Sequence, residues 1–311
     1  MTRGDRVESI HDVDAVIVTA TGVVVDSWGD PDRLVLPRSA SKPIQALPLV
    51  VTGAADAFDL TNVELALACS SHNAEPAHVS AVARWLALIG ATPDDLECGA
   101  HAPLVEEAAA DLFRSGGKPD ASYNNCSGKH AGFLTVCRHV GLDFPGYLEA
   151  SHPLQRDHVT PALEDWCGLD LSDQVPGVDG CGIPVWAIPL KSLAAGWARL
   201  GSGPVGSPEH RLLTAMRAEP FLVAGTGRAC TRLISDSTGG VVVKTGAEGV
   251  FCGTVPDDGL GISLKVRDGA GRASGPAMAW LLRSLDRLDG GDEEMVVNRA
   301  GTVVGAVRVV G

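Results

Sequence analysis

Valine-rich runs at both ends of the chain limit the fold more than any other feature of the sequence. Residues 14–27 read DAVIVTATGVVVDS, in which two β-branched runs flank a Thr-Gly pair, and this pattern predicts a β-hairpin. Three short Val-rich runs lie near the other end, at 239–255, 260–266 and 294–310, and LDGGDEE (288–294) predicts a turn. We therefore expect an antiparallel sheet built from both termini.

The middle of the chain has a different pattern. Apolar residues recur at helical spacing in 63–71, 77–90 and 210–223. Strands at both ends with helices between them predict an α+β fold, in which helices cover one face and one end of the sheet. We expect a single domain over residues 1–311. Its sheet part would comprise 1–38 and 225–311, and its mainly helical part 39–224.

Composition excludes several classes of partner. The formal net charge is −13, and the basic residues form no run, so we expect no nucleic acid partner. The first residues, MTRGDRVESIHDVD, lack the apolar segment of a signal peptide, and no window holds eighteen uninterrupted apolar residues. These features predict a cytoplasmic protein with no membrane contact. In a reducing compartment the eight cysteines are expected as buried thiols rather than disulfides.

PRSASKPIQ (37–45) contains a candidate nucleophile. In a helix that begins near Ser39, Ser39 and Lys42 share one face, so the amine can take the hydroxyl proton if burial lowers its pKa. Ser41 is adjacent to Lys42 and faces another direction. A helix-capping serine with a solvated lysine is the more common meaning of an isolated S-x-x-K. Ser115-Gly-Gly-Lys118 has the same spacing, but its glycines and the following proline predict a loop.

Two further motifs favour the catalytic interpretation. Ser71-His72-Asn73 follows an apolar run, and Lys244-Thr245-Gly246 follows VVV on an expected strand. The order S-x-x-K, S-x-N, K-T-G is the signature of serine acyl-transferases built like penicillin-binding proteins and class A β-lactamases. The distance from Ser39 to Ser71 is shorter than that signature would suggest.

A closer resemblance covers nearly the whole chain. It is carried by RSASKPIQ (38–45), CSSHNAEPAH (69–78), NNCSGKHAGF (124–133), VDGCGIP (178–184), AGTGR (224–228), VVKTGAEGVF (242–251) and LKVRDG (264–269). With these motifs in this order, the sequence resembles the rhizobial-type L-asparaginases, the asparaginase II family. The resemblance implies a serine β-lactamase-like fold, one catalytic domain and a homodimer. It also implies hydrolysis of the side-chain amide of L-asparagine to aspartate and ammonia.

The resemblance implies two catalytic serine–lysine units, Ser39 with Lys42 and Ser71 with Lys244. Ser39 would attack the amide carbonyl while Lys42 takes its proton, and Ser71 with Lys244 would relay a proton to the leaving nitrogen. Backbone N–H groups of Ser39 and Ala247 are expected to hold the oxyanion. Which serine is acylated stays open at this point.

Two cysteines and a lysine form a candidate metal site. Chemistry alone favours Cys126 and Cys181 as buried structural thiols. The resemblance implies instead that Cys126, Lys129 and Cys181 bind Zn²⁺ and leave a fourth position open. His130 and Asp179 are then candidate partners of these ligands.

Several residues are candidates for substrate binding. Arg228 in AGTGR could hold the substrate α-carboxylate with its planar guanidinium, or it could form a surface ion pair. His72 could shape the pocket or be a satisfied structural histidine. Asn73, Gly246, Ala247 and Glu248 complete the expected substrate-binding set.

Two other functions fit the same residues. The first is a different serine acyl-transferase of this architecture, such as a glutaminase, an esterase or a β-lactamase; one methylene separates asparagine from glutamine and is worth only about 1–3 kcal/mol of discrimination. The second is a catalytically silent relative that binds zinc or an amino acid. The presence of Ser39, Lys42, Ser71 and Lys244 together favours an enzyme.

Overall fold

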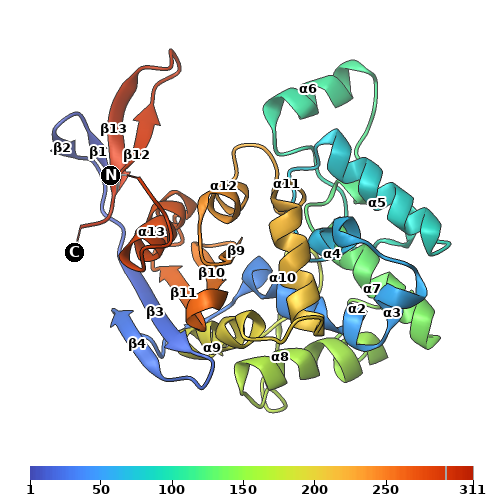
Figure 1. Ribbon diagram of the computed structural model, residues 1–311. Coiled ribbons are helices and arrows are strands. Elements are labelled where there is room, and N and C mark those ends of the chain that lie inside the picture. Colours follow the sequence, from blue (N-terminus) through green and yellow to red (C-terminus); the bar gives the residue numbers. More distant parts are fainter. Residues whose placement is uncertain (291–292, 311) are drawn as a thin grey trace.

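The computed structural model describes residues 1–290 and 293–310. Its centre is a five-stranded antiparallel sheet in the order β4-β3-β11-β10-β9 (Figure 1). The strands are β3 (Val13–Thr19), β4 (Val24–Trp28), β9 (Val242–Thr245), β10 (Val250–Val255) and β11 (Leu260–Val266). Two of them come from the N-terminal part of the chain and three from the C-terminal part. The predicted α+β fold, with an antiparallel sheet from both termini and an inserted helical region, is confirmed.

The last Val-rich run does not join this sheet. Its strands, β12 and β13, pair only with each other, in a hairpin that projects beside the N-terminal β1-β2 hairpin (Figure 1). Most of their side chains are exposed, so they bring no continuous apolar face to pack on the sheet. The turn expected at 288–294 includes residues 291 and 292, which lie outside the described residues. The short strands are β1 (Thr2–Arg3), β2 (Arg6–Val7), β5 (Leu34–Val35), β6 (Gly177–Val178), β7 (Pro184–Val185), β8 (Ile188–Pro189), β12 (Glu293–Val297) and β13 (Val303–Arg308).

Helices fill the inserted region and cover the sheet (Figure 1). The α-helices are α1 (Lys42–Gln45), α2 (Leu47–Val51), α3 (Ala54–Ala57), α4 (Asn62–Ala68), α5 (Pro76–Leu88), α6 (Glu106–Arg114), α7 (Ser127–Val140), α8 (Thr160–Cys167), α9 (Leu190–Gly201), α10 (Pro208–Ala218), α11 (Pro220–Val223), α12 (Ala229–Asp236) and α13 (Gly271–Ser284). Short 3₁₀ segments are η1 (Arg38–Ser41), η2 (Pro93–Asp95), η3 (Ala121–Tyr123) and η5 (Pro256–Asp258), and η4 (Gln155–Val159) is a π-helical turn. Within the described residues no helix is long and apolar enough to cross a membrane.

Helices α9 and α13 pack on opposite faces of the sheet. Successive residues of a strand face opposite sides, so Gly261 and Ser263 of β11 point to one face and Ile262 and Leu264 to the other. The Ser263 hydroxyl donates a hydrogen bond of 2.6 Å to the carbonyl of Leu190 in α9. The opposite face is covered by α13, which packs on β10 and β11. Strands β10 and β11 are therefore buried on both sides, whereas the edge strand β4 is mostly exposed.

The contact between α9 and β11 requires a glycine. A Cβ atom at Gly261 would lie 2.0 Å from the Ala194 carbonyl oxygen and 2.4 Å from the Ala198 nitrogen, and both are backbone atoms. We expect Gly261→Ala to lower the free energy of unfolding by about 1–3 kcal/mol, since helix and sheet must separate. Urea denaturation measures this. Gly271→Ala is the matched control, because a Cβ atom there meets nothing within 4 Å; equal effects of the two changes would contradict the close contact.

Candidate active site

The structure brings the three serine–lysine motifs together from distant parts of the chain. Lys42 begins α1, Ser71 follows the end of α4, and Lys244 lies on β9. All three side chains are buried. The Ser71 Oγ atom accepts one hydrogen bond from Lys42 Nζ and another from Lys244 Nζ, each of 2.9 Å. One serine hydroxyl is thus held between two lysine amines.

Burial sets the protonation of Lys244. Burial, opposed by Cys230 and assisted by the neighbouring charge of Lys42, lowers the pKa of Lys244 to about 7. Near neutral pH a large fraction of this amine is therefore without its extra proton and can accept one. Lys244 Nζ also donates to the Thr245 carbonyl at 2.8 Å, and Lys42 Nζ to the Ser70 carbonyl. These carbonyls fix both amines beside the Ser71 hydroxyl.

Ser39 lies at the edge of this group. It is half-buried on η1, and its hydroxyl makes no hydrogen bond with any described residue. Lys42 Nζ bonds to Ser71, not to Ser39. Ser41 is buried and donates to the Arg38 carbonyl at 2.9 Å, so its hydroxyl is already used within the turn.

Gly246 allows the end of β9 to approach η1. A Cβ atom at Gly246 would lie 2.5 Å from the Pro37 carbonyl oxygen and 3.4 Å from the Ala40 side chain. Gly246 thus meets the residues on either side of Arg38 and Ser39, and the N–H of the next residue, Ala247, donates no hydrogen bond to another described residue. Glu248 adopts a left-handed backbone (φ 57°). A Cβ atom at Gly269 would lie 2.7 Å from its carboxylate, which places that carboxylate against the next turn.

His72 uses both ring nitrogens within the protein. Its Nδ1 accepts the Ala74 N–H at 3.1 Å, so Nε2 carries the proton and donates to Ser127 Oγ at 2.9 Å. Its backbone N–H donates to the Asn125 carbonyl at 3.1 Å. Burial holds the pKa of His72 well below its ordinary value, which keeps the ring neutral. His72 therefore joins the Ser71 segment to the start of α7.

Asn73 and Arg228 form a second link at the site. Arg228 donates to the Asn73 side-chain oxygen at 2.7 Å, and the Asn73 amide donates to the Thr226 carbonyl at 3.0 Å and to Glu75 at 3.1 Å. The Asn73 N–H also donates to the Ala224 carbonyl at 2.9 Å. Sequence analysis did not identify Glu75 or Thr226 as partners of Asn73. Both residues do lie within motifs that carry the family resemblance, CSSHNAEPAH and AGTGR.

The candidate metal ligands also lie together. Cys126, Lys129 and Cys181 are buried, and Lys129 Nζ donates to Cys181 Sγ at 3.0 Å. The hydrogen bond from Cys181, with the charges of Lys42 and Lys129, holds the pKa of Cys126 well below its ordinary value, whereas the same bond raises the pKa of Cys181. No three His, Cys, Asp or Glu side chains of the described residues form a metal-binding group. The two cysteine sulfurs are donors that zinc prefers, and the Lys129 amine could add a third only after losing its proton.

An arginine that sequence reasoning did not single out connects η1 to this cluster. Arg38 has a left-handed backbone (φ 51°) and forms an ion pair with Asp179. Burial alone would raise the pKa of Asp179, but the charges of Lys129 and Arg38 hold it below its ordinary value. His130 Nδ1 is 2.8 Å from the Tyr147 hydroxyl. Of the two expected partners of the metal ligands, Asp179 therefore contacts Arg38 and His130 contacts Tyr147.

A serine hydroxyl between two buried lysine amines, beside a helix-covered antiparallel sheet, is the kind of site that serine–lysine hydrolases use to transfer acyl groups. Residues 1–309 match the sequence model of the protein family described as L-asparaginase II. The chain belongs to this family, which supports a hydrolase, and the family predicted from the motifs is confirmed. The sequence matches none of the curated proteins.

Solved structures with a distant likeness include three enzymes. A β-lactamase from Mycobacterium bovis has 16% identity and a TM-score of 0.39, covering 89% of this chain and 95% of its own. Simvastatin synthase from Aspergillus terreus has 12% identity and a TM-score of 0.41, covering 82% and 86%. A D-alanine carboxypeptidase from Burkholderia cenocepacia has 12% identity and a TM-score of 0.35, covering 84% and 91%. The family assignment rests on the sequence match alone.

The low pKa of Lys244 gives a test of the buried amine. Between pH 7 and the ordinary lysine value of 10.5, the unfolded chain holds this proton and the folded chain does not, so stability rises with pH across that range. Lys244→Met removes this dependence. We expect it to stabilise the protein by a few kcal/mol at pH 6 and by much less at pH 9.5, since one pKa unit is worth about 1.4 kcal/mol.

Urea denaturation of both proteins at the two pH values measures the difference. The exposed Lys118 supplies the control variant Lys118→Met, with an expected change within about 0.5 kcal/mol at either pH. A stability difference for Lys244→Met that stays constant from pH 6 to 9.5 would refute the lowered pKa.

Proposed function

We propose that the protein is an L-asparagine amidohydrolase that releases aspartate and ammonia through an acyl-enzyme. The observation that supports this most directly is the Ser71 hydroxyl between Lys42 and Lys244, with the pKa of Lys244 near 7. Such a group can take up and deliver protons at neutral pH, as amide cleavage requires. Membership of the L-asparaginase II family supports the substrate.

In the proposed reaction, Ser39 Oγ attacks the side-chain carbonyl carbon of asparagine. The hydroxyl proton passes to Lys42, and a proton from the Ser71–Lys244 pair goes to the amide nitrogen, which leaves as ammonia. Water then cleaves the ester and releases aspartate. The Ser39 hydroxyl has no partner among the described residues, so it is available to substrate. The N–H groups of Ser39 and Ala247 would hold the oxyanion.

Ser71 is the second candidate nucleophile. Its Oγ already has two amines within 2.9 Å, the contact that activates a serine, whereas Ser39 has none. Its side chain is more deeply buried than that of Ser39, which favours the relay role. The two assignments differ in which residue carries the acyl group.

We also propose how the substrate is held. Arg228 would bind the α-carboxylate while remaining bonded to Asn73, and Glu248 would lie toward the α-ammonium. His72, Asn73, Gly246 and Ala247 would form the wall of the pocket. A cytoplasmic homodimer is part of this proposal, and so is a preference for asparagine over glutamine.

Cys126, Lys129 and Cys181 would hold Zn²⁺. The ion, when bound, would orient the substrate and polarise nearby groups as a Lewis acid. Lys129 must be neutral to ligate, so zinc binding would have to displace its proton, because the neighbouring thiols hold the pKa of Lys129 above its ordinary value. Its Nζ atom lies 3.0 Å from Cys181 Sγ. Asp179, paired with Arg38, fixes the loop that carries Cys181.

Ammonia release from L-asparagine tests the serine–lysine mechanism. We expect Ser39→Ala, Lys42→Ala and Ser71→Ala each to lower kcat by more than about a thousandfold, as the loss of a nucleophile or its base does. Ser115→Ala is the matched control, because it alters an S-x-x-K serine that lies in an exposed turn. Mass mapping of the trapped acyl group should find it on Ser39. An adduct on Ser71 would move the nucleophile there.

The same assay with L-glutamine separates the rival substrate. Release from glutamine alone would make the protein a glutaminase, and release from neither amide would withdraw the proposed substrate. Activity that survives both Ser39→Ala and Ser71→Ala would overturn the serine mechanism.

Metal analysis of the purified protein tests the zinc proposal. We expect about one zinc ion per chain in the wild type and loss of most of it in Cys126→Ala and Cys181→Ala, because each removes a ligand. Cys137→Ala alters a buried cysteine on the same helix as Lys129 and should leave the zinc content unchanged. Unchanged zinc in both ligand variants would refute the site.

A further inference from the structure

An acidic residue beside the candidate active site has no part in the proposed reaction. Glu75 precedes the first turn of α5 and is partly exposed. Its carboxylate accepts hydrogen bonds from the Thr226 N–H at 2.8 Å, from the Thr226 hydroxyl at 2.7 Å and from the Asn73 side-chain amide at 3.1 Å. Burial alone would raise the pKa of Glu75, but these bonds hold it below its ordinary value, so the carboxylate is charged at neutral pH.

The orientation of the Asn73 amide depends on Glu75. The amide nitrogen has two N–H groups, one of which donates to Glu75 and the other to the Thr226 carbonyl at 3.0 Å. The amide oxygen is therefore left to accept from Arg228, at 2.7 Å. A rotated amide would set its oxygen against the Glu75 carboxylate and its N–H groups against the guanidinium, and both contacts would be repulsive. Glu75 thus decides which end of Asn73 faces Arg228.

Backbone packing holds these groups against the segment that carries Ser71. The N–H groups of Ser71 and Asn73 each donate a hydrogen bond of 2.9 Å to a carbonyl of residues 223–224. At Gly225 the backbone is left-handed (φ 114°), and a Cβ atom would lie 2.5 Å from the Glu75 carboxylate and 2.6 Å from the Asn73 amide nitrogen. The loop that leads to Arg228 is therefore packed directly on the Glu75–Asn73 pair.

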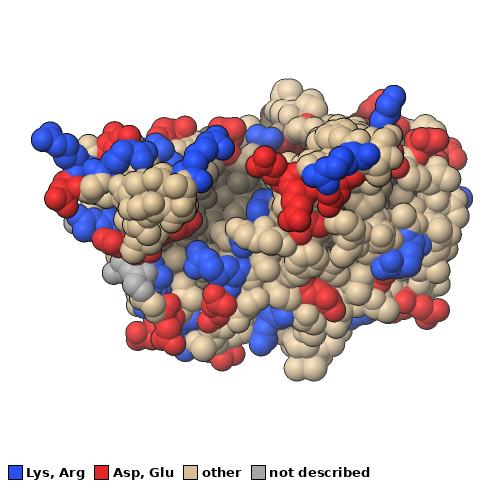
Figure 2. Space-filling model, turned by 90° about the horizontal axis from the view of Figure 1, so that it is seen from above, with Lys and Arg blue, Asp and Glu red and all other residues tan. Residues whose placement is uncertain are grey.

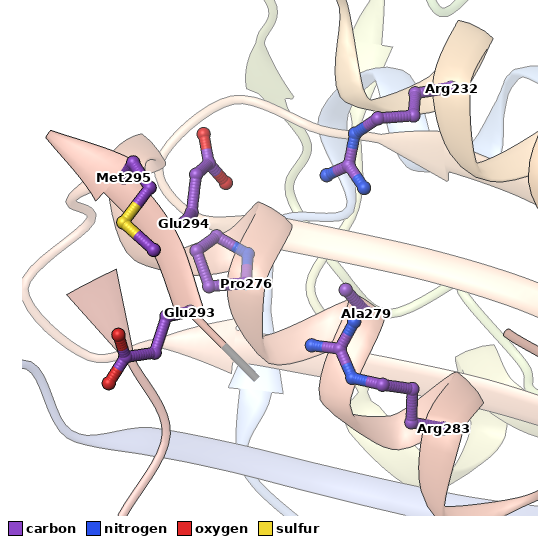
Figure 3. Close-up of a pocket in the computed structure, with 7 residues that line it drawn as sticks. All are labelled: Arg232, Pro276, Ala279, Arg283, Glu293, Glu294 and Met295. Atoms are coloured by element: carbon purple, nitrogen blue, oxygen red, sulfur yellow. The ribbon is translucent and has the colours of Figure 1, made fainter. Parts of the chain in front are cut away.

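Arg228 is the arginine of this loop that reaches the active site. The loop joins α11 to α12 and lies between the β12–β13 hairpin and α6 (Figure 1). Seen from above, the molecule is hollowed between the end that carries this hairpin and the helical part (Figure 2). The charge of Arg228 contributes to the low pKa of Lys244, so the guanidinium lies near the serine–lysine group. Arg232, one turn further along α12, lines a separate cavity of about 250 Å³ beside α13 (Figure 3).

We propose that Glu75 is a positioning residue that holds Arg228 in place for the substrate α-carboxylate and so restricts the substrate to free amino acids. This inference rests on the proposed function and adds to it what determines the substrate class. Arg228 uses one N–H group on Asn73 and has further N–H groups for a carboxylate. Because the guanidinium is already held, it loses little freedom when a carboxylate binds. An amide without an α-carboxylate gains nothing from this arrangement.

Kinetics of ammonia release from L-asparagine test the role of Glu75. Glu75→Met removes the acceptor oxygens at similar side-chain length, and we expect KM to rise at least about tenfold while kcat stays within about threefold, since the reacting groups are untouched. Glu75→Gln keeps an oxygen for Asn73 and the Thr226 N–H, so its KM should stay within about threefold of the wild-type value. An unchanged KM in Glu75→Met, or a kcat that falls as far as KM rises, would overturn the inference.

Glu64 supplies a matched control on the first turn of α4. Its carboxylate accepts the Thr61 N–H at 2.9 Å and the Thr61 hydroxyl at 2.7 Å, which are nearly the contacts that Glu75 makes with Thr226. Glu64→Met should therefore leave KM unchanged. A rise in KM equal to that of Glu75→Met would show that loss of any such glutamate disturbs the site, and would refute a specific role for Glu75.

A double-mutant cycle shows whether Glu75 acts through Arg228. We expect Arg228→Met to raise KM at least about tenfold, and Glu75→Met to add less than about threefold in that background, because the group it positions is already gone. Effects of the two changes that multiply in full would show that Glu75 acts independently of Arg228, contrary to the inference.

β-Alaninamide, which is asparagine without its α-carboxylate, tests the substrate class. We expect Glu75→Met to leave the inhibition constant of β-alaninamide against asparagine hydrolysis within about twofold of the wild-type value, because this amide has no carboxylate for Arg228. An inhibition constant that rises as far as the KM of asparagine would mean that the whole pocket is disturbed, and would overturn the inference.

Crystal structures of the wild type, Glu75→Met and Glu75→Gln give a readout that does not depend on turnover. We expect the bond between Arg228 and Asn73 to be absent in Glu75→Met and present in Glu75→Gln. An intact bond in Glu75→Met would overturn the inference even if asparagine is the substrate. A wild type that releases no ammonia would instead refute the proposed function, and this comparison would then decide the role of Glu75. Glu75→Ala, which truncates a partly exposed side chain, replaces Glu75→Met if that variant does not fold.

Discussion

The burial of three lysines in one interior region is the constraint on which the rest of the structure depends. Lys42, Lys129 and Lys244 are each at most 1% exposed. A buried ammonium group is unfavourable unless it gains acceptors or loses its proton. Lys244 loses its proton readily, whereas nearby thiols raise the pKa of Lys129 against the effect of burial. The fold must therefore bring hydroxyl, carbonyl and sulfur acceptors to these three amines.

Close backbone contacts deliver those acceptors. At Gly246, the end of β9 meets η1, so the strand that carries Lys244 packs on the segment that carries Ser39. A Cβ atom at Gly128 would lie 2.3 Å from the Leu67 carbonyl oxygen, so only glycine lets the first turn of α7 pack on the end of α4. This second contact sets Lys129 and Cys126 beside the segment that carries Ser71. Glycine at these positions is thus a requirement of packing that fixes the chemistry.

The serine–lysine group and the cysteine–lysine group are neighbours, not separate centres. Lys42 bonds to Ser71, and its charge also helps to lower the pKa of Cys126. His72 ties the Ser71 segment to Ser127, the residue after Cys126. A change in charge at the cysteines would therefore act on the amine that also holds the Ser71 hydroxyl.

The sequence alone determined the features that depend on local pattern: the β3–β4 hairpin, the helical middle and the order of the three short motifs, from which the family followed. Only the tertiary structure decided which groups meet. Ser71 is 29 residues from Lys42 and 173 from Lys244, so no periodicity reports that both amines reach its hydroxyl. The sequence likewise did not predict that Arg38 pairs with Asp179 or that β12 and β13 stay apart from the main sheet, because both depend on contacts between distant segments. Side-chain contacts between distant segments depend on how helices and sheet pack, and that packing is set by the whole buried core at once.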